Sequence, residues 1–472
     1  MRVLMLGWEF PPFIAGGLGT ACHGLTRALD RLGQDVLFVL PRSADGWSGS
    51  RVRVVGPNAI QQATLTARPD PDAGIGGDGS FPVVEGPIEG FERARFVGVP
   101  AGFSHPYPGS SGPVGGGADL GSSVAASAAT PPREKAALDA AGVPSEPAGG
   151  RAAIGGHHYS GDMQRDCETY AQMLVRFAGA ERFDVIHAHD WMTYPAGMAL
   201  SRVSSRPMVA HIHSTEFDRS GENINQRVYD IERRGMHAAV RVVAVSRLTK
   251  SICIERYGIS PDKIDVVYNG VEREDQQPAP GSQIESTDKI VLFLGRITMQ
   301  KGPEYFVRAA RRVLDRYENV KFVVAGSGDM AMRMIEEAAA LGIGHKVLFT
   351  GFLRGKDVDR VFQMADCYVM PSVSEPFGIA PLEAMKNDVP VIISKQSGVS
   401  EVLTHALKVD FWDIDEMANK VIAVLRHPPL SQTLRQHGPM ELRGLTWDGA
   451  AQRVIDIYDD VLRSVGQPVE LG

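Results

Sequence analysis

The chain has 472 residues, of which 43% are hydrophobic and 22% charged, as in an ordinary globular protein. This length exceeds what one hydrophobic core usually organises, so we expect two domains. With a formal net charge of −7, the bulk electrostatics of the chain favour neither nucleic acid nor an anionic membrane, and we predict no nucleic-acid partner.

The N-terminal segment "MRVLMLGWEFPPF" contains a short apolar run that ends at Pro11-Pro12 and is followed by no small-residue cleavage site. It predicts a first β-strand rather than a signal peptide. No stretch approaches the roughly 20 apolar residues of a transmembrane segment, so none is expected. The four cysteines have no CxxC spacing, which favours a reducing compartment. We therefore predict a cytoplasmic protein.

Short apolar runs alternate with longer amphipathic runs along most of the chain. Buried strands are expected at residues 2–8, 35–40, 184–190, 207–214, 241–246 and 264–270, and again at 289–297, 320–328, 346–352, 366–372 and 390–397. Helical patterns lie between many of them, for example at residues 24–33 and 224–240. This alternation is typical of parallel sheets covered by helices on both faces, and two consecutive sets predict two doubly wound α/β domains.

Two irregular segments suggest where these domains are divided. Residues 272–289 are polar and contain two prolines, and we take them as the seam between the domains. A segment rich in Gly, Ser, Ala and Pro predicts a disordered insertion at about residues 105–156. The predicted domains span residues 1–280 and 286–450, and a final helix over residues 451–472 is expected to cross back to the first domain.

Glycines follow the first predicted strand, in "GWEFPPFIAGGLGTACHGL". Gly16, Gly17 and Gly19 lie where a loop turns into a helix, so the backbone there can approach a phosphate closely. The dinucleotide fingerprint G-x-G-x-x-G fails, because counting from Gly17 its last glycine falls on Cys22. The alternative is that these glycines only form a tight turn.

A second glycine motif is a better match to a dinucleotide site. Gly326, Gly328 and Ala331 satisfy G-x-G-x-x-A after a predicted strand. A nicotinamide site also needs an acidic residue about 20 positions further on, and Thr350 and Gly351 supply none. We therefore expect a loop near a nucleotide, with Gly326 in the binding set, and no bound cofactor.

Two cations leave the end of the strand predicted at residues 289–297, in "LGRITMQKGPEYFVRAA". Arg296 and Lys301 precede a helix whose start is marked by Pro303. If they converge they could hold a diphosphate, with arginine as a planar fork and lysine as a point charge. Solvated surface side chains are the alternative.

Two histidine pairs lie near the ends of two predicted strands: His187 with His189, and His211 with His213. Residues two apart on a strand face the same way, so each pair could chelate a metal, as in a metal-dependent hydrolase. The interpretation we prefer is one histidine beside a sugar, as hydrogen-bond partner or proton carrier. A core histidine satisfied by the backbone remains the alternative for any of the four.

The stretch "SVSEPFGIAPLEAM" places Glu375 and Glu383 around a Pro-Phe-Gly turn that opens into a helix. The N-terminus of a helix favours anions, beside which two carboxylates are poorly placed unless they serve hydroxyl groups or a positive charge. A phosphorylated sugar offers all of these features. A helix cap and a solvated helix residue are the structural alternative.

Taken together, "PPFIAGGLG", "HAHDW", "GRITMQKG" and "SEPFGIAPLEAM" in this order resemble the retaining nucleotide-sugar glycosyltransferases of the GT-B fold. Glycogen and starch synthases and their sucrose-synthase relatives belong to that family. The resemblance covers nearly the whole chain except the predicted insertion. It implies two Rossmann-like domains that face a cleft, and no bound metal.

The resemblance also implies roles for matching residues. Glu375 would face the transferred sugar and Glu383 would hold the nucleoside ribose, while the backbone N–H groups near Gly378 and Ile379 would meet sugar and phosphate. Arg296 would neutralise the diphosphate leaving group.

Lys301 would share the diphosphate with the arginine, so that side chains replace the metal ion of other transferases. Gly17 and Leu18 would contribute backbone donors from the opposite domain, and His189 would lie near O6 of the sugar. One position departs from the bacterial glycogen synthases, because Ile14 stands where they carry a lysine. The choice of donor is therefore open.

We thus expect a retaining, metal-independent hexosyltransferase that moves glucose from ADP-glucose or UDP-glucose to a glucan or other carbohydrate acceptor. Glycogen or α-1,4-glucan synthesis is the leading reaction. Mannosyl transfer and the formation of sucrose, trehalose or maltose phosphate are alternatives within the family. A metal-dependent hydrolase and a non-catalytic nucleotide-sugar sensor are the alternatives from other classes.

Overall fold

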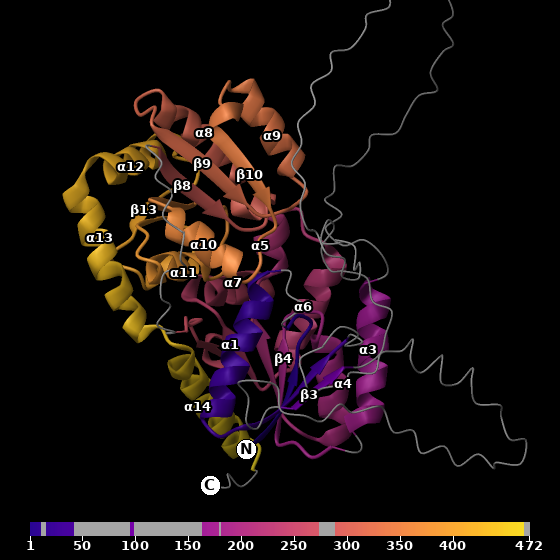
Figure 1. Ribbon diagram of the computed structural model, residues 1–472. Coiled ribbons are helices and arrows are strands. Elements are labelled where there is room, and N and C mark those ends of the chain that lie inside the picture. The colour runs from indigo at the N-terminus through magenta and orange to yellow at the C-terminus, as the bar shows by residue number, and fades with distance from the viewer. Residues whose placement is uncertain (11–15, 42–94, 99–162, 179–180, 273–287, 467–472) are drawn as a thin grey trace, which may run out of the picture.

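The computed structural model describes residues 1–10, 16–41, 95–98, 163–178, 181–272 and 288–466. Within these residues the strands form two parallel sheets, each covered by helices (Figure 1). The insertion predicted at about residues 105–156, and most of the seam predicted at 272–289, lie outside the described residues.

The first sheet has seven strands in the order β3-β2-β1-β4-β5-β6-β7, all paired in parallel. Their bounds are β1 Arg2–Leu6, β2 Asp35–Leu40, β3 Arg95–Gly98, β4 Val185–His189, β5 Met208–Ile212, β6 Arg241–Ala244 and β7 Ile264–Val266. The order reverses between β1 and β4, and ligands of doubly wound sheets bind beyond such a reversal.

The second sheet has six parallel strands in the order β10-β9-β8-β11-β12-β13. Their bounds are β8 Lys289–Leu294, β9 Val320–Ala325, β10 Val347–Gly351, β11 Cys367–Met370, β12 Val391–Ser394 and β13 Leu407–Val409. Its order reverses between β8 and β11, which repeats the arrangement of the first sheet.

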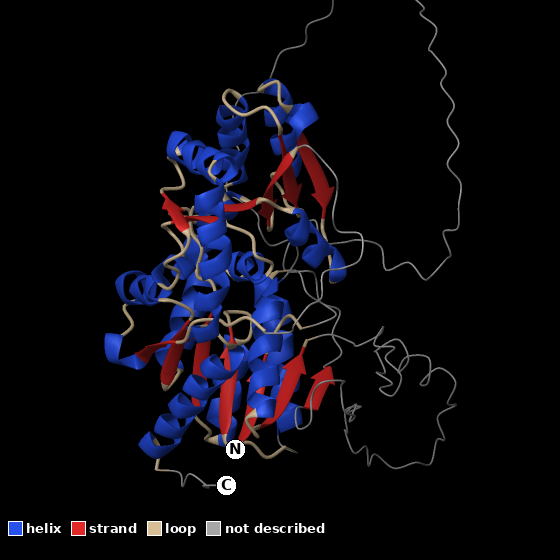
Figure 2. Cartoon of the chain, turned by 60° about the vertical axis from the view of Figure 1, so that its left-hand side comes forward, coloured by secondary structure: helices blue, strands red, loops and turns tan. Residues whose placement is uncertain are grey.

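Helices connect the strands and cover both faces of each sheet (Figure 2). The helices of the first sheet are α1 Gly17–Arg31, α3 Met163–Ala178, α4 Tyr194–Ser204, α5 Glu216–Ser220, α6 Gln226–Ala238 and α7 Arg247–Tyr257. Those that follow are α8 Pro303–Leu314, α9 Ala331–Ala340, α10 Lys356–Met364, α11 Ala380–Lys386, α12 Ile414–Arg426, α13 Pro428–Glu441 and α14 Trp447–Ser464. Pro303 stands at the first position of α8, where its missing N–H costs no hydrogen bond.

The central strands of both sheets are buried on both faces, which explains why they are almost continuously apolar in sequence. In β4, Ile186 and Ala188 face one core cluster, while Val185 faces the other. A strand with two buried faces has no polar side and therefore shows no alternation. The second sheet likewise separates two core clusters.

The last helix of the chain completes the core of the first sheet. In Figure 1, α14 in yellow lies beside α1 in indigo. Trp447 packs so tightly on Gly24 that a Cβ atom at Gly24 would lie 2.2 Å from the indole ring. Arg31 Nη2 of α1 also lies 2.6 Å from Oδ1 of Asp448. Within the described residues, α14 thus belongs to the first core although it follows the second sheet in sequence.

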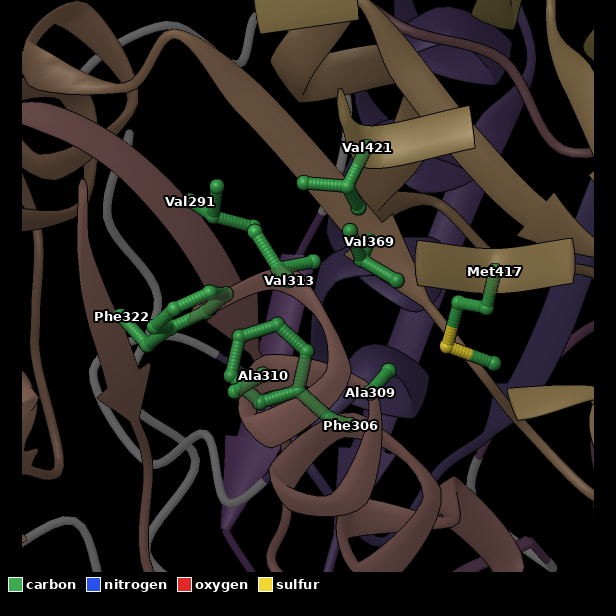
Figure 3. Close-up of a pocket in the computed structure, with 9 residues that line it drawn as sticks. All are labelled: Val291, Phe306, Ala309, Ala310, Val313, Phe322, Val369, Met417 and Val421. Atoms are coloured by element: carbon green, nitrogen blue, oxygen red, sulfur yellow. The ribbon is translucent and has the colours of Figure 1, made fainter. Parts of the chain in front are cut away.

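Each sheet with its helices is called a unit below, and the second unit is the one built on the six-stranded sheet. A gap lined only by apolar side chains lies inside this second unit (Figure 3). Phe306 and Ala310 of α8 face Phe322 of β9 there, and Met417 of α12 closes another side. Without a polar group to orient a ligand, this gap is an element of core packing. None of the helices among the described residues has the length and hydrophobicity needed to cross a bilayer.

Trp447→Ala is expected to destabilise the protein by about 3–5 kcal/mol, because it leaves a cavity between α1 and α14. The measurement is the midpoint of thermal or denaturant unfolding. Trp412→Ala is the matched control: the Trp412 side chain is 57% exposed, and its loss should change stability by less than about 0.5 kcal/mol. Equal effects of the two substitutions would contradict the packing described for α14.

Candidate functional site

The candidate residues lie at the carboxyl ends of strands near the reversal point of each sheet. His189 ends β4, Arg296 and Lys301 follow β8, and Glu375 follows β11. The two sheets approach each other at these ends, since a Cβ atom at Gly16 would lie 3.8 Å from Nε of Arg296. The structure therefore brings the predicted cations close to the predicted glycine loop.

Lys301 and Glu375 form a partly buried ion pair. Lys301 Nζ lies 2.6 Å from Oε2 of Glu375, and Ser372 donates a hydrogen bond of 3.0 Å to the same oxygen. The Glu375 residue is only 6% exposed. Its main chain is fixed as well, because its N–H donates to the carbonyl of Gln396 and its carbonyl accepts from Gly398. The carboxylate is therefore held in one place.

Arg296 reaches the same region from the end of β8. Its Nη2 lies 3.4 Å from Oε1 of Gln300, a buried residue of the short 3-10 turn that ends at Lys301. Gln300 also accepts a backbone hydrogen bond from Val373, two residues before Glu375. The loops after β8 and β11 are thus joined, which sets the two cations and the carboxylate relative to one another.

The turn after Glu375 depends on a glycine. Gly378 has a φ of 101°, which side chains of L-residues rarely tolerate, and a Cβ atom there would lie 3.2 Å from Cγ of Glu375. Phe377 anchors the turn from the core. Ile379 caps α11, so its neighbours present the first backbone N–H groups of that helix. A side chain at position 378 would therefore crowd the side chain of Glu375.

Glu383 lies in the first turn of α11, as the sequence predicts. Its carboxyl is partly buried, and burial raises its pKa to about 7, with repulsion from Asp359 acting in the same direction and attraction from Lys386 opposing it. The carboxyl therefore changes charge close to neutral pH.

The four histidines form one cluster at the ends of β4 and β5. His187 Nε2 lies 3.0 Å from Nδ1 of His211, and His189 Nδ1 lies 2.9 Å from Nε2 of His213. The hydrogen bonds thus run between the strands rather than within each predicted pair, because the parallel register places His189 beside His211. The partners of these ring nitrogens are other side chains rather than backbone groups.

Burial keeps these histidines neutral. It lowers the pKa of His187 to about 3, with the nearby His213 as a second cause, and it lowers the pKa of His213 to about 3. The pKa values of His189 and His211 are also lowered, first by burial and then by the neighbouring imidazoles. A neutral imidazole can both donate and accept a hydrogen bond. Tyr458 of α14 contacts the cluster, 2.5 Å from Nδ1 of His187.

Two groups of potential metal ligands share His189. The ligating atoms of Cys22, His189 and His213 lie within 4.8 Å of one another, and so do those of His187, His189 and His211. Asp190 adjoins the cluster, has a φ of 59° and accepts a 2.6 Å hydrogen bond from the His213 N–H. Burial raises its pKa to about 7, and that hydrogen bond opposes the shift.

The glycines after β9 have a structural explanation. Gly326 has a φ of 148°, and a Cβ atom there would lie 1.8 Å from the carbonyl oxygen of Gly295. The loop after β9 therefore needs glycine because it packs on the backbone at the end of β8. This close approach accounts for the G-x-G-x-x-A match without a dinucleotide.

Three further residues of interest lie in the loop after β1 and at the start of α1. Gly17 begins α1, and a Cβ atom there would have nothing within 4 Å among the described residues. Leu18 packs against the cores of the first sheet. Ile14 lies outside the described residues, so the structure does not address its departure from the family pattern.

Sequence reasoning missed a contact between the two units. Asp218 of α5 accepts a hydrogen bond of 2.5 Å from Ser374, the neighbour of Glu375. Asp218 also belongs to a capping box with Thr215. The T-x-x-D spacing could have predicted the cap, but no signal within either segment predicts the contact across 156 positions.

Glu383→Gln tests the environment of this carboxyl. Because the pKa of Glu383 in the folded protein (about 7) exceeds its ordinary value of 4.5, the folded state binds more protons between these values and loses stability as the pH rises. The variant should therefore gain stability over the wild type from pH 5 to pH 8, with the difference levelling off above about pH 7. Thermal unfolding across this range measures it. Glu336→Gln, on an exposed position of α9, is the control; a stability difference for Glu383→Gln that does not change with pH would contradict the analysis.

Family models match successive parts of the chain. The starch synthase catalytic domain matches residues 2–68, glycosyltransferase family 4 matches 137–275, and glycosyl transferases group 1 matches 275–440. An uncharacterized glycosyltransferase of Methanocaldococcus jannaschii is 32% identical over 309 residues, which cover 61% of this chain and 78% of the relative.

Two further comparisons extend over nearly the whole chain. The glycogen synthase of Mycobacterium tuberculosis is 24% identical over 99% of this chain and 97% of its own. The structure of the Anabaena protein Alr3699/HepE in complex with UDP-glucose superposes with a TM-score of 0.62 at 15% identity, over 98% of this chain and all of that one (100%).

The fold and these matches define an enzyme that transfers glycosyl groups. The chain belongs to the GT-B glycosyltransferases of the glycogen synthase type. The predicted fold class and family are thereby confirmed.

Proposed function

We propose that this chain is a retaining hexosyltransferase that moves glucose from ADP-glucose or UDP-glucose to the hydroxyl group of a carbohydrate acceptor, without a bound metal ion. An α-1,4-glucan is the leading acceptor. The observation that carries the proposal is the contact between Lys301 and Glu375, supported by Ser372, beside Arg296. A cation and an acid fixed together match the two opposite charges that develop when a sugar leaves a diphosphate.

The charges of the transition state decide which residue does what. Breaking the bond to the diphosphate leaves negative charge on oxygen, which Lys301 and Arg296 would stabilise in place of a metal ion. The sugar gains positive charge, which the carboxylate of Glu375 would stabilise. The two hydrogen bonds to Glu375 both use Oε2, so Oε1 can accept a sugar hydroxyl.

Other residues would bind the rest of the donor. The carboxylate of Glu383 would accept the ribose hydroxyls, and Gly326 would lie near the nucleotide. The N–H groups near Gly378 and Ile379 would meet the sugar and phosphate. Gly17 and Leu18 would supply backbone donors from the first unit. Each of these roles follows the family resemblance.

His189 would bind the O6 hydroxyl of the sugar as a neutral imidazole. Burial lowers its pKa well below the usual value, so its charge does not change near neutral pH. Its Nε2 is buried and has no hydrogen-bond partner among the described residues, which suits a ligand hydroxyl.

Retention would result from attack on the face that the diphosphate leaves. The acceptor oxygen bonds to the anomeric carbon as the bond to phosphate breaks, and the leaving phosphate oxygen takes the acceptor's proton. No second carboxylate is then needed as a nucleophile. Contact between the two units, such as that of Ser374 with Asp218, would help to exclude water during transfer.

The glycogen synthase of Mycobacterium tuberculosis supports glucan synthesis, and the UDP-glucose complex of the Anabaena protein supports a glucose donor. A mannosylfructose-phosphate synthase of Agrobacterium fabrum, 22% identical over 66% of this chain, keeps other hexosyl transfers as alternatives. A hydrolase with a metal at the histidine pairs and a non-catalytic sensor both conflict with membership of a transferase family.

Glu375→Gln is expected to lower kcat by roughly 100-fold or more, because the charge that stabilises the sugar is lost. Lys301→Met should have an effect of similar size through the leaving group. Steady-state rates of nucleoside diphosphate release measure both, and unfolding midpoints establish that the variants fold.

Lys395→Met is the matched control for Lys301→Met. Lys395 also pairs with a carboxylate, Asp410, at 2.8 Å, but its side chain is 54% exposed. Its removal should leave kcat within about twofold, since exposed ion pairs contribute little. Full activity of folded Glu375→Gln would refute the assigned site.

The reaction itself is tested with a panel of donors and acceptors. ADP-glucose, UDP-glucose and GDP-mannose are each incubated with glycogen, maltose or monosaccharides, and diphosphate release is followed. We expect release with one glucose donor and a glucan, together with an α-linked product by NMR. A β-linked product would exclude retention. Donor binding without release for any acceptor would favour the sensor.

A further inference from the structure

The histidine cluster holds more ligating groups than a sugar hydroxyl requires. Besides His189, the proposed sugar partner, it contains three more buried or partly buried imidazoles, and the thiol of Cys22 from α1 adjoins it. Cys22 is completely buried and forms no disulfide. The proposed transfer reaction uses neither this thiol nor His213.

The spacing of these groups suits a transition-metal ion. Tetrahedral zinc with bonds of about 2.0–2.3 Å places its ligand atoms about 3.3–3.8 Å apart. The ligating atoms of Cys22, His189 and His213 already lie within 4.8 Å of one another, so side-chain shifts of about 1 Å close the site. One thiolate and two imidazoles are ligands that zinc prefers, and three protein ligands leave a fourth position open.

One observation besides the spacing points to a bound ligand. Nε2 of His189 is a buried nitrogen without a hydrogen-bond partner among the described residues. A buried polar atom of this kind usually has a partner, and a metal ion at the cluster would supply one.

The alternative ligand set replaces Cys22 and His213 by His187 and His211. His187 is less available, because Tyr458 occupies its Nδ1 and His211 its Nε2. By contrast, the hydrogen bond of His213 to His189 uses only Nε2 of His213. His213 is only partly buried, so one ligand of the first set is in contact with solvent.

We propose that Cys22, His189 and His213 bind one Zn²⁺-class ion, and that this ion competes with the nucleotide sugar. On binding, the Cys22 thiol loses its proton to solvent and the sulfur–metal bond forms, with no change of oxidation state. The metal occupies His189, so the sugar O6 loses its partner. The competition rests on the proposed function, whereas the metal site itself does not.

The direct test is metal binding to the full-length protein after removal of metals with a chelator. Titration with ZnCl₂ is followed by calorimetry and elemental analysis, without donor or acceptor. We expect one zinc ion per chain. With Co²⁺ we expect a thiolate-to-metal charge-transfer band in the near ultraviolet, which reports the Cys22 ligand directly.

Cys22→Ala should remove that band and weaken zinc binding roughly 100-fold or more, since even outer partners of a metal site contribute 10–100-fold. Cys253→Ala, at another buried free cysteine, is the matched control and should bind like the wild type. His211→Val should also retain binding. If His211→Val abolishes binding while Cys22→Ala preserves it, or if the wild type binds no zinc, the proposal is overturned.

Kinetics then test the competition. Zinc should raise the KM for the nucleotide sugar in the wild type but not in Cys22→Ala, whose activity without zinc should be unchanged. If the protein binds zinc but has no transferase activity, the proposed function is refuted and the proposed metal site is supported. If the protein transfers sugar but binds no zinc, the proposed function is supported and the metal site is refuted.

Discussion

Parallel pairing of the strands is the constraint on which this structure depends. A parallel sheet needs a crossover after every strand, so all strands of a sheet end at the same edge. Loops after β1, β4, β8 and β11 therefore gather at the reversal points of the two sheets. Strands supply the apolar cores, and the loops are free to carry charged side chains.

The ion pair of Lys301 with Glu375 shows how such an edge can hold opposite charges. A buried carboxylate is costly unless it is paired and hydrogen-bonded, and here a lysine and a serine hydroxyl meet this need. The histidine cluster differs from this ion pair because its imidazoles carry no charge: burial lowers their pKa values and keeps them neutral. The site thus combines an ion pair on the second unit with neutral imidazoles on the first.

The sequence predicted the strands well, because buried parallel strands form apolar runs that loops interrupt. Two short strands were missed, β3 and β13, since "RFVG" and "LKV" are too short to give a pattern. Helix α1 begins at Gly17, earlier than the periodic run at 24–33 indicates, because its first turn contains two glycines, which are poor helix formers.

The motifs named Arg296, Lys301 and Glu375, which the structure places on joined loops, but they did not predict the contacts. The link of Lys301 to Glu375 joins positions 74 apart, and only the order of β8 and β11 in the sheet brings them together. The pairing of histidines across strands depends in the same way on register, which a single sequence does not reveal. Burial, which shifts the pKa of Glu383, is likewise a property of the fold.

The position of α14 limits how the chain can be divided into fragments that fold. Its Trp447 and Tyr458 belong to the core of the first sheet, and Tyr458 contacts His187 at the histidine cluster. A fragment cut after β7 would therefore expose an apolar groove along α1 and lose a neighbour of the cluster. Chimeras that exchange one half with a relative need to carry this helix with the N-terminal half, as a segment discontinuous in sequence.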